Sequence, residues 1–220
     1  MSPTAREVLD RLEAQAGPVR PPVDGPFAFV LYEQIAYLAS DQRRAAAFAA
    51  LEHRVGLEPV AILAATSATL VEICALGGIY PEERAERLKR SAAIALERCD
   101  GDLTRLARLP LAAARKIARS FDSFGAANAE ALLLFAGVAV PALDSNGVRV
   151  FSRIWFGGET GRYASDHRRA CASVNADGPL VVAELIRIYL AARRHGQTLC
   201  RRNAPSCDAC PLQSVCAFVR

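Results

Sequence analysis

The stretch CRRNAPSCDACPLQSVC, residues 200–216, is the part of the sequence that decides the fold. Its four cysteines have the spacing C-x6-C-x2-C-x5-C, and they are Cys200, Cys207, Cys210 and Cys216. Thiolates are ligands of Zn²⁺ and of iron–sulfur clusters, and four so close together can surround one metal centre. The spacing differs from the two short pairs of a zinc ribbon and from the ferredoxin run. An iron–sulfur cluster, a structural zinc and thiols without metal all remain open at this point.

The composition indicates a helical globular protein. Apolar residues make up 52% of the 220 residues, but aromatic residues only 7%. The longest apolar run, residues 131–143, is interrupted by Pro141 and is too short to span a membrane. The N-terminal residues 1–13 mix charges and lack an apolar signal region, so we expect a cytoplasmic protein with no membrane partner. Seven cysteines in that compartment favour reduced thiols and metal ligation over disulfides.

Arginine dominates the basic residues. The formal net charge is +4, and Lys89 and Lys116 are the only lysines among 27 basic residues. The second half of the chain is rich in arginine, which suits contact with phosphate and salt-dependent binding to polyanions. A solvated basic surface is the alternative explanation.

Helical periodicity runs through the sequence, whereas strand signals are almost absent, so we predict an all-α fold. Gly17–Pro26, with four prolines, is expected to be a linker. The predicted helices are residues 4–16, 27–39, 42–55, 59–65, 69–76, 81–98, 103–106, 111–120, 128–137, 145–155, 163–174 and 179–195.

The cysteine loop, residues 200–216, resembles the cluster loop of the endonuclease III branch of the helix-hairpin-helix DNA glycosylases, and His195-Gly196 just upstream agrees. The resemblance implies a [4Fe–4S] cluster held by the four cysteines. It also implies two lobes, a helical barrel at 27–138 and a discontinuous cluster lobe formed by 1–26 and 139–220, with the DNA groove between them. The implied partner is double-stranded DNA with damaged or mismatched bases, bound by a monomer associated with the nucleoid.

The segment LDSNGVRVFSR, residues 143–153, carries the second signal. Asp144 stands at a predicted helix start, where a carboxylate accepts backbone N–H bonds. The resemblance makes Asp144 the catalytic carboxylate, since breaking an N-glycosidic bond develops positive charge that a nearby carboxylate stabilises. The same resemblance assigns Arg149 to DNA binding. A plain helix cap is the alternative role for Asp144.

The segment FDSFGAANAE, residues 121–130, occupies the place of the family's hairpin, whose glycines expose N–H groups to a DNA phosphate. Ser123, Phe124 and Gly125 are the expected DNA contacts. Asp122-Ser123 replaces the usual Pro-Gly, so DNA affinity is expected to be reduced.

The Schiff-base lysine of bifunctional relatives is missing. Counting from Gly125 or from Asp144 reaches Ala127 or Ala126, and Lys116 lies ten residues before Ala126. An amine is needed to attack the sugar carbon and allow β-elimination. We therefore expect a monofunctional enzyme with weak or no lyase activity.

Three further residues are expected to touch DNA. Gln34 falls where the family places a glutamine that fills the gap left by a flipped base, and Arg201 and Arg202 of the cysteine loop are expected to meet phosphate. The sequence thus predicts a base-excision-repair glycosylase. The alternatives are a non-catalytic DNA- or damage-binding relative and a redox-sensing iron–sulfur regulator.

Overall fold

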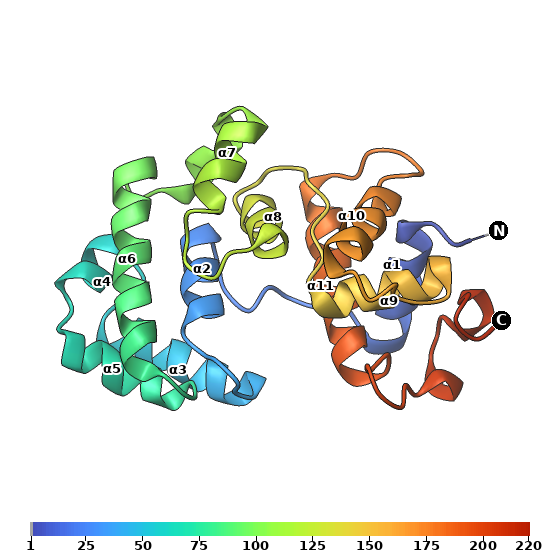
Figure 1. The fold of residues 1–220 in the computed structure, drawn as a ribbon, viewed down its shortest axis with the longest axis horizontal. Coiled ribbons are helices and arrows are strands. Elements are labelled where there is room, and N and C mark those ends of the chain that lie inside the picture. The colour runs from blue at the N-terminus through green and yellow to red at the C-terminus, as the bar shows by residue number, and fades with distance from the viewer. Residues whose placement is uncertain (1) are drawn as a thin grey trace. The chain divides into compact units, whose positions relative to one another are not determined.

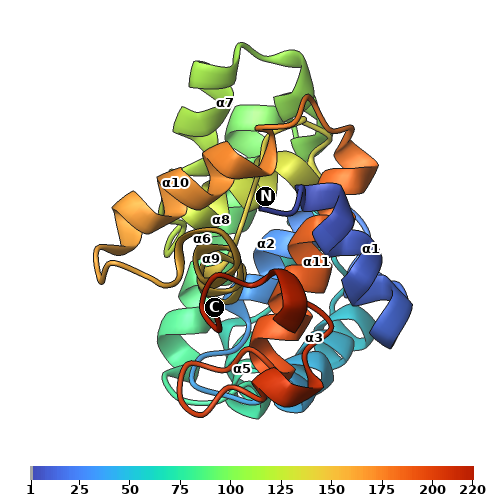
Figure 2. The ribbon, with the colours of Figure 1, turned by 90° about the vertical axis from the view of Figure 1, so that its right-hand side faces the viewer.

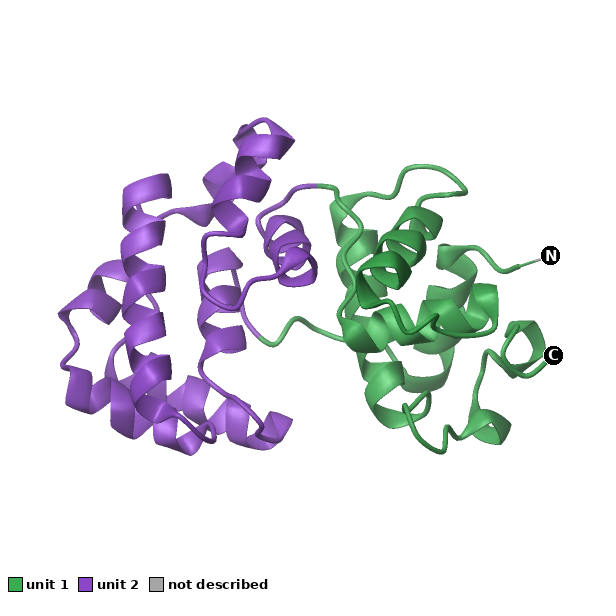
Figure 3. Cartoon of the chain, in the orientation of Figure 1, with its two compact units in different colours: residues 1–22, 139–220 green, residues 23–138 purple. Residues whose placement is uncertain are grey.

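The computed structural model describes residues 2–220, and in that range it contains helices, turns and loops but no β-strand (Figure 1). The predicted all-α class is therefore confirmed. Two compact units divide the chain, residues 23–138 and residues 1–22 with 139–220 (Figure 3). The sequence predicts the first boundary at residue 27, and the structure has it at residue 23, in the turn before α2 (Pro26–Gln34). No helix within residues 2–220 is long and apolar enough to cross a membrane.

Residues 23–138, which we call the central unit, form a bundle around the long helix α6. Its elements are α2 (Pro26–Gln34), α3 (Asp41–Arg54), α4 (Pro59–Ala64), α5 (Ser67–Leu76), α6 (Pro81–Cys99), the 3₁₀-helix η1 (Leu103–Arg108), α7 (Leu111–Ala118) and α8 (Ala126–Phe135). Small buried residues on α6, Ala85, Ala92 and Ala95, allow α2, α4 and α5 to approach it closely. Phe29 of α2 stacks on Phe135 of α8 with ring centroids 4.6 Å apart.

Two surface loops of the central unit are joined by an isolated parallel bridge between Tyr37 and Gly78. A Cβ atom at Gly77 would collide with the carbonyl oxygen of Ile35, and one at Gly78 with that of Tyr37. Glycine is therefore required where the two loops meet.

The guanidinium of Arg84 lies beneath these loops. Arg84 is only 1% exposed, and it donates hydrogen bonds to the carbonyl oxygens of Ile35, Gly78 (2.8 Å) and Ile79 (2.9 Å). A buried charge is tolerated here because backbone dipoles solvate it in place of water. The side chain of Arg84 thus links the two loops, residues 35–40 and 77–80, which we call the loop pair.

The second unit, which we call the cysteine-loop unit, joins the N-terminal helix to the C-terminal part of the chain. Its elements are α1 (Ala5–Ala16), α9 (Ser145–Phe156), α10 (Tyr163–Val174), α11 (Val182–Thr198) and the 3₁₀-helices η2 (Cys207–Ala209) and η3 (Gln213–Val215). Helix α1 packs along α11 (Figure 2), and an Arg6–Glu184 ion pair of 2.8 Å and a Glu13–Arg187 pair link the two helices. Glycine at position 17 ends α1, where the N–H bonds back to Glu13.

One predicted helix has a different form. The segment expected as a helix at 103–106 is a 3₁₀-helix, Leu103–Arg108. The Asp102 side chain accepts the N–H of Thr104, and Pro110 follows two residues after the end of η1. A cap at the start and a proline soon after the end leave no room for an α-helix.

Replacing Arg84 with methionine should lower the free energy of unfolding by about 2–4 kcal/mol, because buried carbonyl oxygens would lose their donors. Urea unfolding followed by circular dichroism measures this change. Arg98→Met is the matched control, since Arg98 lies in the last turn of the same helix with its side chain 58% exposed. Equal stability of the two variants would contradict the role given to Arg84.

Candidate active site and metal centre

Asp144 caps the N-terminus of α9. Its Oδ1 accepts the N–H of Gly147 at 2.7 Å, and its Oδ2 accepts an amide N–H of Asn146 at 3.1 Å. The side chain is 17% exposed, so the carboxylate reaches the surface while its orientation is fixed. The capping role and the availability of the carboxylate for chemistry are therefore compatible.

Asn146 and Arg149 connect this carboxylate to the cysteine loop. Arg149 donates to Oδ1 of Asn146 at 2.7 Å, to the carbonyl of Cys200 at 2.9 Å and to the carbonyl of Gly196 at 2.8 Å. Hydrogen bonds therefore run without a break from Asp144 to the first cysteine of the loop. Arg149, which the resemblance assigns to DNA binding, is 4% exposed, and its donors bond to backbone carbonyls, so the role that the structure shows for it is to hold the cysteine loop.

Gly196 allows α9 and α11 to meet at this point. A Cβ atom there would lie 2.7 Å from the Cβ of Asn146 and 2.9 Å from its carbonyl oxygen. The side chain of any other residue would force the end of α11 away from the start of α9. Close packing between α9 and α11 thus explains why glycine follows His195 in this sequence.

Arg153, one turn further along α9, holds the next part of the loop. It is 8% exposed, and it donates to the carbonyls of Arg201 at 2.8 Å and Arg202 at 3.1 Å. Its Nη1 also lies 3.4 Å from Sγ of Cys200. Arg153 thus fixes the loop backbone at Arg201 and Arg202, and the side chains of these two residues are exposed. Arg202 lies 3.9 Å from Glu159, and Arg201 donates to the carbonyl of Ala204 at 3.3 Å.

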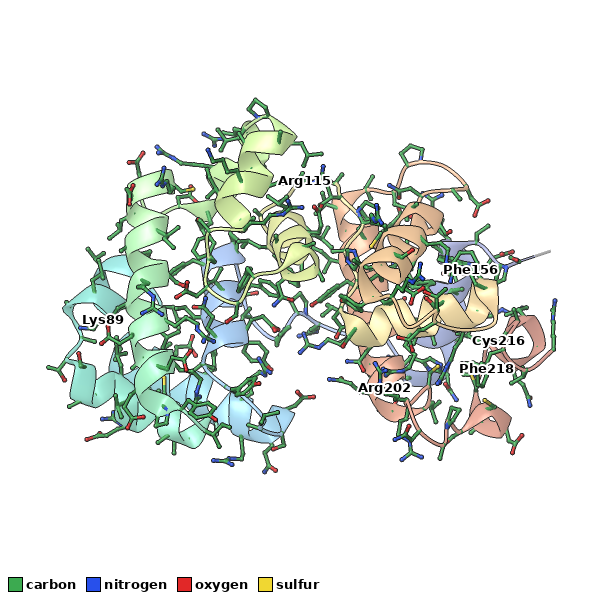
Figure 4. The ribbon with its side chains drawn as sticks, in the orientation of Figure 1. Lys89, Arg115, Phe156, Arg202, Cys216 and Phe218 are labelled. Atoms are coloured by element: carbon green, nitrogen blue, oxygen red, sulfur yellow. The ribbon has the colours of Figure 1, made fainter. Side chains whose placement is uncertain are left out.

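All four cysteines of the loop line one cavity, together with Arg153 and Phe218 among others. Cys216 and Phe218 lie next to each other at the end of the loop (Figure 4). His195 places its Nε2 3.5 Å from Sγ of Cys210. Within residues 2–220, however, no three His, Cys, Asp or Glu side chains are gathered closely enough to hold a metal ion.

The chemistry of these thiols tests whether they fit a metal centre. Burial is the largest cause that raises the pKa of Cys210 and of Cys216 above the ordinary value, and the charges of the neighbouring cysteines raise it further. Four half-buried thiolates this close together would repel one another unless a cation joined them. The four cysteines therefore fit a metal centre, which would neutralise this charge. Their sulfur atoms, however, do not converge on a single point.

The hairpin segment keeps its turn without the usual glycine. Ser123 adopts the left-handed conformation with φ +66°, and Gly125 caps α8 and is exposed. The side chain of Phe124 is 5% exposed and packs edge-on against Phe29 with centroids 6.3 Å apart, so it belongs to the core of the central unit. Its N–H already donates to Phe121 at 3.1 Å. Asp122 pairs with Arg90 at 2.6 Å, which neutralises its charge.

Gln34 supports the hairpin from within the central unit. Its amide donates to the carbonyl of Asp122 at 2.9 Å and accepts from the hydroxyl of Ser91 at 2.8 Å, and the residue is 2% exposed. In the structure Gln34 therefore supports the hairpin from within, and its entry into a duplex stays a prediction. Both ends of its amide are bonded, and removing it from the core would leave buried partners unsatisfied.

The positions of the missing lysine lie in the first turn of α8, since Ala126 and Ala127 directly follow the Gly125 cap. Lys116 is exposed on the preceding helix α7. Helix α8 therefore carries no lysine whose amine could attack a sugar.

Two residues near Asp144 had no signal in the sequence. Arg193 of α11 brings its Nε to 3.7 Å from Oδ2 of Asp144. Tyr163 begins α10, and partial burial, followed by the charge of Asp144, raises its pKa to about 12. Only the packing of α10 and α11 against α9 places these side chains beside the carboxylate.

Positive charge gathers on the unit that contains Asp144. The cysteine-loop unit carries 14 of the 27 basic and 9 of the 23 acidic side chains, a net charge of +5. The central unit carries 13 basic and 14 acidic side chains, a net charge of −1.

Comparison with solved structures identifies the class of fold. Endonuclease III, solved as a covalent intermediate trapped with DNA, superposes with a TM-score of 0.74 at 16% identity over 97% of this chain and 94% of that one. A thermostable thymine-DNA glycosylase gives 0.77 at 18% identity over 98% and 94%. The 3-methyladenine DNA glycosylase of H. pylori, bound to 1,N6-ethenoadenine, gives 0.64 at 16% identity over 89% and 95%.

The chain therefore has the helix-hairpin-helix DNA glycosylase fold, as the resemblance implies. At these identities the likeness establishes the fold alone. No protein-family model and no curated protein matches the sequence.

Replacing Arg149 with leucine should destabilise the cysteine-loop unit by about 3–5 kcal/mol, because the carbonyls of Cys200 and Gly196 and the amide of Asn146 lose a buried charged donor. Chemical denaturation measures the change. Arg162→Leu is the control, since Arg162 is exposed in the same unit. If Arg149→Leu proved as stable as the control, the hydrogen-bond chain would have no structural importance.

Proposed function

We propose that this protein is a DNA N-glycosylase that removes damaged or mismatched bases by hydrolysis. One observation carries the proposal: an accessible carboxylate, Asp144, is held at a helix start by hydrogen bonds that continue to the cysteine loop, within a glycosylase fold. The covalent intermediate and the base-bound complex among the solved structures support the same class of substrate.

Asp144 would act on the sugar. As the glycosidic bond breaks, positive charge develops on the anomeric carbon, and a fixed carboxylate beside it stabilises that charge or orients a water. Gly147 and Asn146 hold the carboxylate in place, so little reorganisation is needed when the charge appears. With alanine at 126 and 127, water would be the nucleophile and the enzyme would be monofunctional.

DNA contact would come from exposed groups of both units. Arg201 and Arg202 project from the loop backbone that Arg153 fixes, and phosphate is the ligand that such side chains suit. In the hairpin, the exposed Ser123 and the N–H groups after Gly125 would serve the same role. Retaining the turn with serine supports this role, although the fit to phosphate is expected to be weaker than with two glycines.

The loop pair of the central unit offers apolar groups for opening a duplex, in place of the buried Gln34. Leu38 is 76% exposed, Tyr80 is 59% exposed and Ile79 is 44% exposed. Leu38 and Tyr80 have positive φ angles of 48° and 56°, a strained conformation that proteins retain mainly at functional sites. Apolar side chains inserted between bases compensate for lost stacking.

The cysteine loop would hold a [4Fe–4S] cluster through Cys200, Cys207, Cys210 and Cys216. A cube is ligated at its separate corners, so its thiolates stand wider apart than the four ligands of one zinc ion, and this suits sulfurs that share a cavity without converging. When bound, the cluster supplies a crosslink that stabilises the loop.

A non-catalytic DNA- or damage-binding protein is the second candidate. The contact between Arg193 and Asp144 favours it, since a neighbouring cation weakens the field that the carboxylate exerts on a sugar. The altered hairpin at Asp122-Ser123 also favours it.

A panel of duplexes that contain oxidised pyrimidines, uracil, mismatched thymine, 8-oxoguanine or alkylated adenine separates the two candidates. We expect release of at least one base, slowed by about 10²-fold or more in Asp144→Asn, which keeps the helix cap but removes the charge. Asp102→Asn is the control, because Asp102 also caps a helix and lies in the central unit.

A trapping assay on abasic DNA shows whether the protein forms a Schiff base. Borohydride treatment on abasic DNA should leave little covalent adduct, and an efficient adduct would show that another amine replaces the missing lysine. Tight binding with no release across the panel would instead favour the non-catalytic candidate.

Purified protein should contain about four iron atoms per chain and show the broad visible absorbance of an iron–sulfur cluster. Cys207→Ser should lose the iron and lower the thermal stability, whereas Cys171→Ala, outside the loop, should retain both. Elemental analysis and thermal unfolding measure these outcomes. Zinc without iron in the unaltered protein would contradict the cluster.

A further inference from the structure

The contact of Arg193 with Asp144 has a geometry that does not serve to orient the carboxylate. The Nε–Oδ2 distance of 3.7 Å is longer than a hydrogen bond, and the Gly147 N–H and the Asn146 amide already bond the two oxygens at 2.7 and 3.1 Å. Arg193 therefore adds positive charge at this place but little positional constraint.

The guanidinium is also placed where another anion can reach it. The Arg193 side chain is 18% exposed, and its Nη1 lies 3.4 Å from the hydroxyl of Tyr189, one turn earlier on α11. An ion pair between partly exposed side chains that is not hydrogen-bonded contributes little to stability. A phosphate can accept two parallel bonds from one guanidinium, which is a stronger interaction.

A sugar at Asp144 brings phosphates with it. Each nucleotide of a DNA strand carries a phosphodiester on both sides of its sugar, so a sugar beside this carboxylate places phosphate charge within reach of an arginine side chain. Without a cation, the carboxylate and the phosphates would repel each other. Arg193 is positioned to offset that repulsion.

We infer that Arg193 is a phosphate-binding residue of the candidate active site, and that it exchanges Asp144 for a backbone phosphate of the strand that contains the target nucleotide. This inference rests on the proposed function and adds a DNA contact to it. Before DNA binds, Arg193 neutralises the carboxylate. Once the guanidinium turns to the phosphate, the negative charge of Asp144 faces the sugar.

The phosphate contact is tested by the salt dependence of binding to a duplex that contains a tetrahydrofuran abasic analogue, which needs no base release. Arg193→Gln should reduce the slope of log K against log salt by about 0.9 relative to the unaltered protein. Arg187→Gln is the control, since it removes the same charge from the same helix at a residue that pairs with Glu13. Its slope should not change.

The exchange itself is tested by a double-mutant cycle in the same binding assay. Asp144→Asn should raise the affinity roughly tenfold in the unaltered background, because it removes the repulsion between the carboxylate and the phosphates and the attraction that holds the guanidinium to Asp144. In the Arg193→Gln background the gain should be smaller by roughly threefold. Thermal unfolding of each variant checks that it is folded.

The possible outcomes distinguish failure of the inference about Arg193 from failure of the proposed function. Binding by the unaltered protein, with equal slopes for Arg193→Gln and Arg187→Gln, overturns the inference and leaves the proposed function standing. A changed slope with equal gains in the cycle supports the phosphate contact but overturns the exchange. Absence of DNA binding by the unaltered protein overturns the proposed function, and the inference with it.

Discussion

The Arg149 guanidinium is the interaction on which the arrangement of the candidate site depends. It joins the first turn of α9 to the end of α11 and to the first residue of the cysteine loop, and Arg149 precedes Gly196 and Cys200 by 47 and 51 residues in the sequence. Arg153 extends the same connection by one helical turn. Because both arginines bond to backbone carbonyls, the position of the loop determines that of Asn146, and Asn146 in turn orients Asp144.

The two units use the same physical device for different purposes. Arg84 in the central unit and Arg149 in the cysteine-loop unit are both buried and both donate to carbonyls. Each holds the backbone of an irregular segment in place. In the central unit, this leaves apolar side chains of the loop pair exposed. In the other unit, it fixes a loop whose arginine side chains remain in solvent.

The sequence predicts those features that depend on local order. The helical fold class follows from periodicity, the cap at Asp144 from its place before an apolar helix, and the cavity of four cysteines from their close spacing. It does not show burial that depends on distant segments. Gln34, Phe124 and Arg149 have residue types suited to DNA contact, yet packing places each of them in a core. Likewise, Arg193 meets Asp144 only because Gly196 lets α11 approach α9.

The altered hairpin and the missing lysine can be understood together through charge. If the protein acts as proposed, without a Schiff base, it needs no amine beside the sugar, and alanine at positions 126 and 127 leaves the first turn of α8 without a cation in a central unit whose net charge is −1. In the proposed function, electrostatic attraction to DNA would come from the other unit, whose net charge is +5. The exposed Arg201 and Arg202 and the partly exposed Arg193 belong to that unit and lie on the segments that Arg149 and Arg153 hold together. The proposed phosphate contact would therefore depend on the same buried hydrogen bonds that orient the carboxylate.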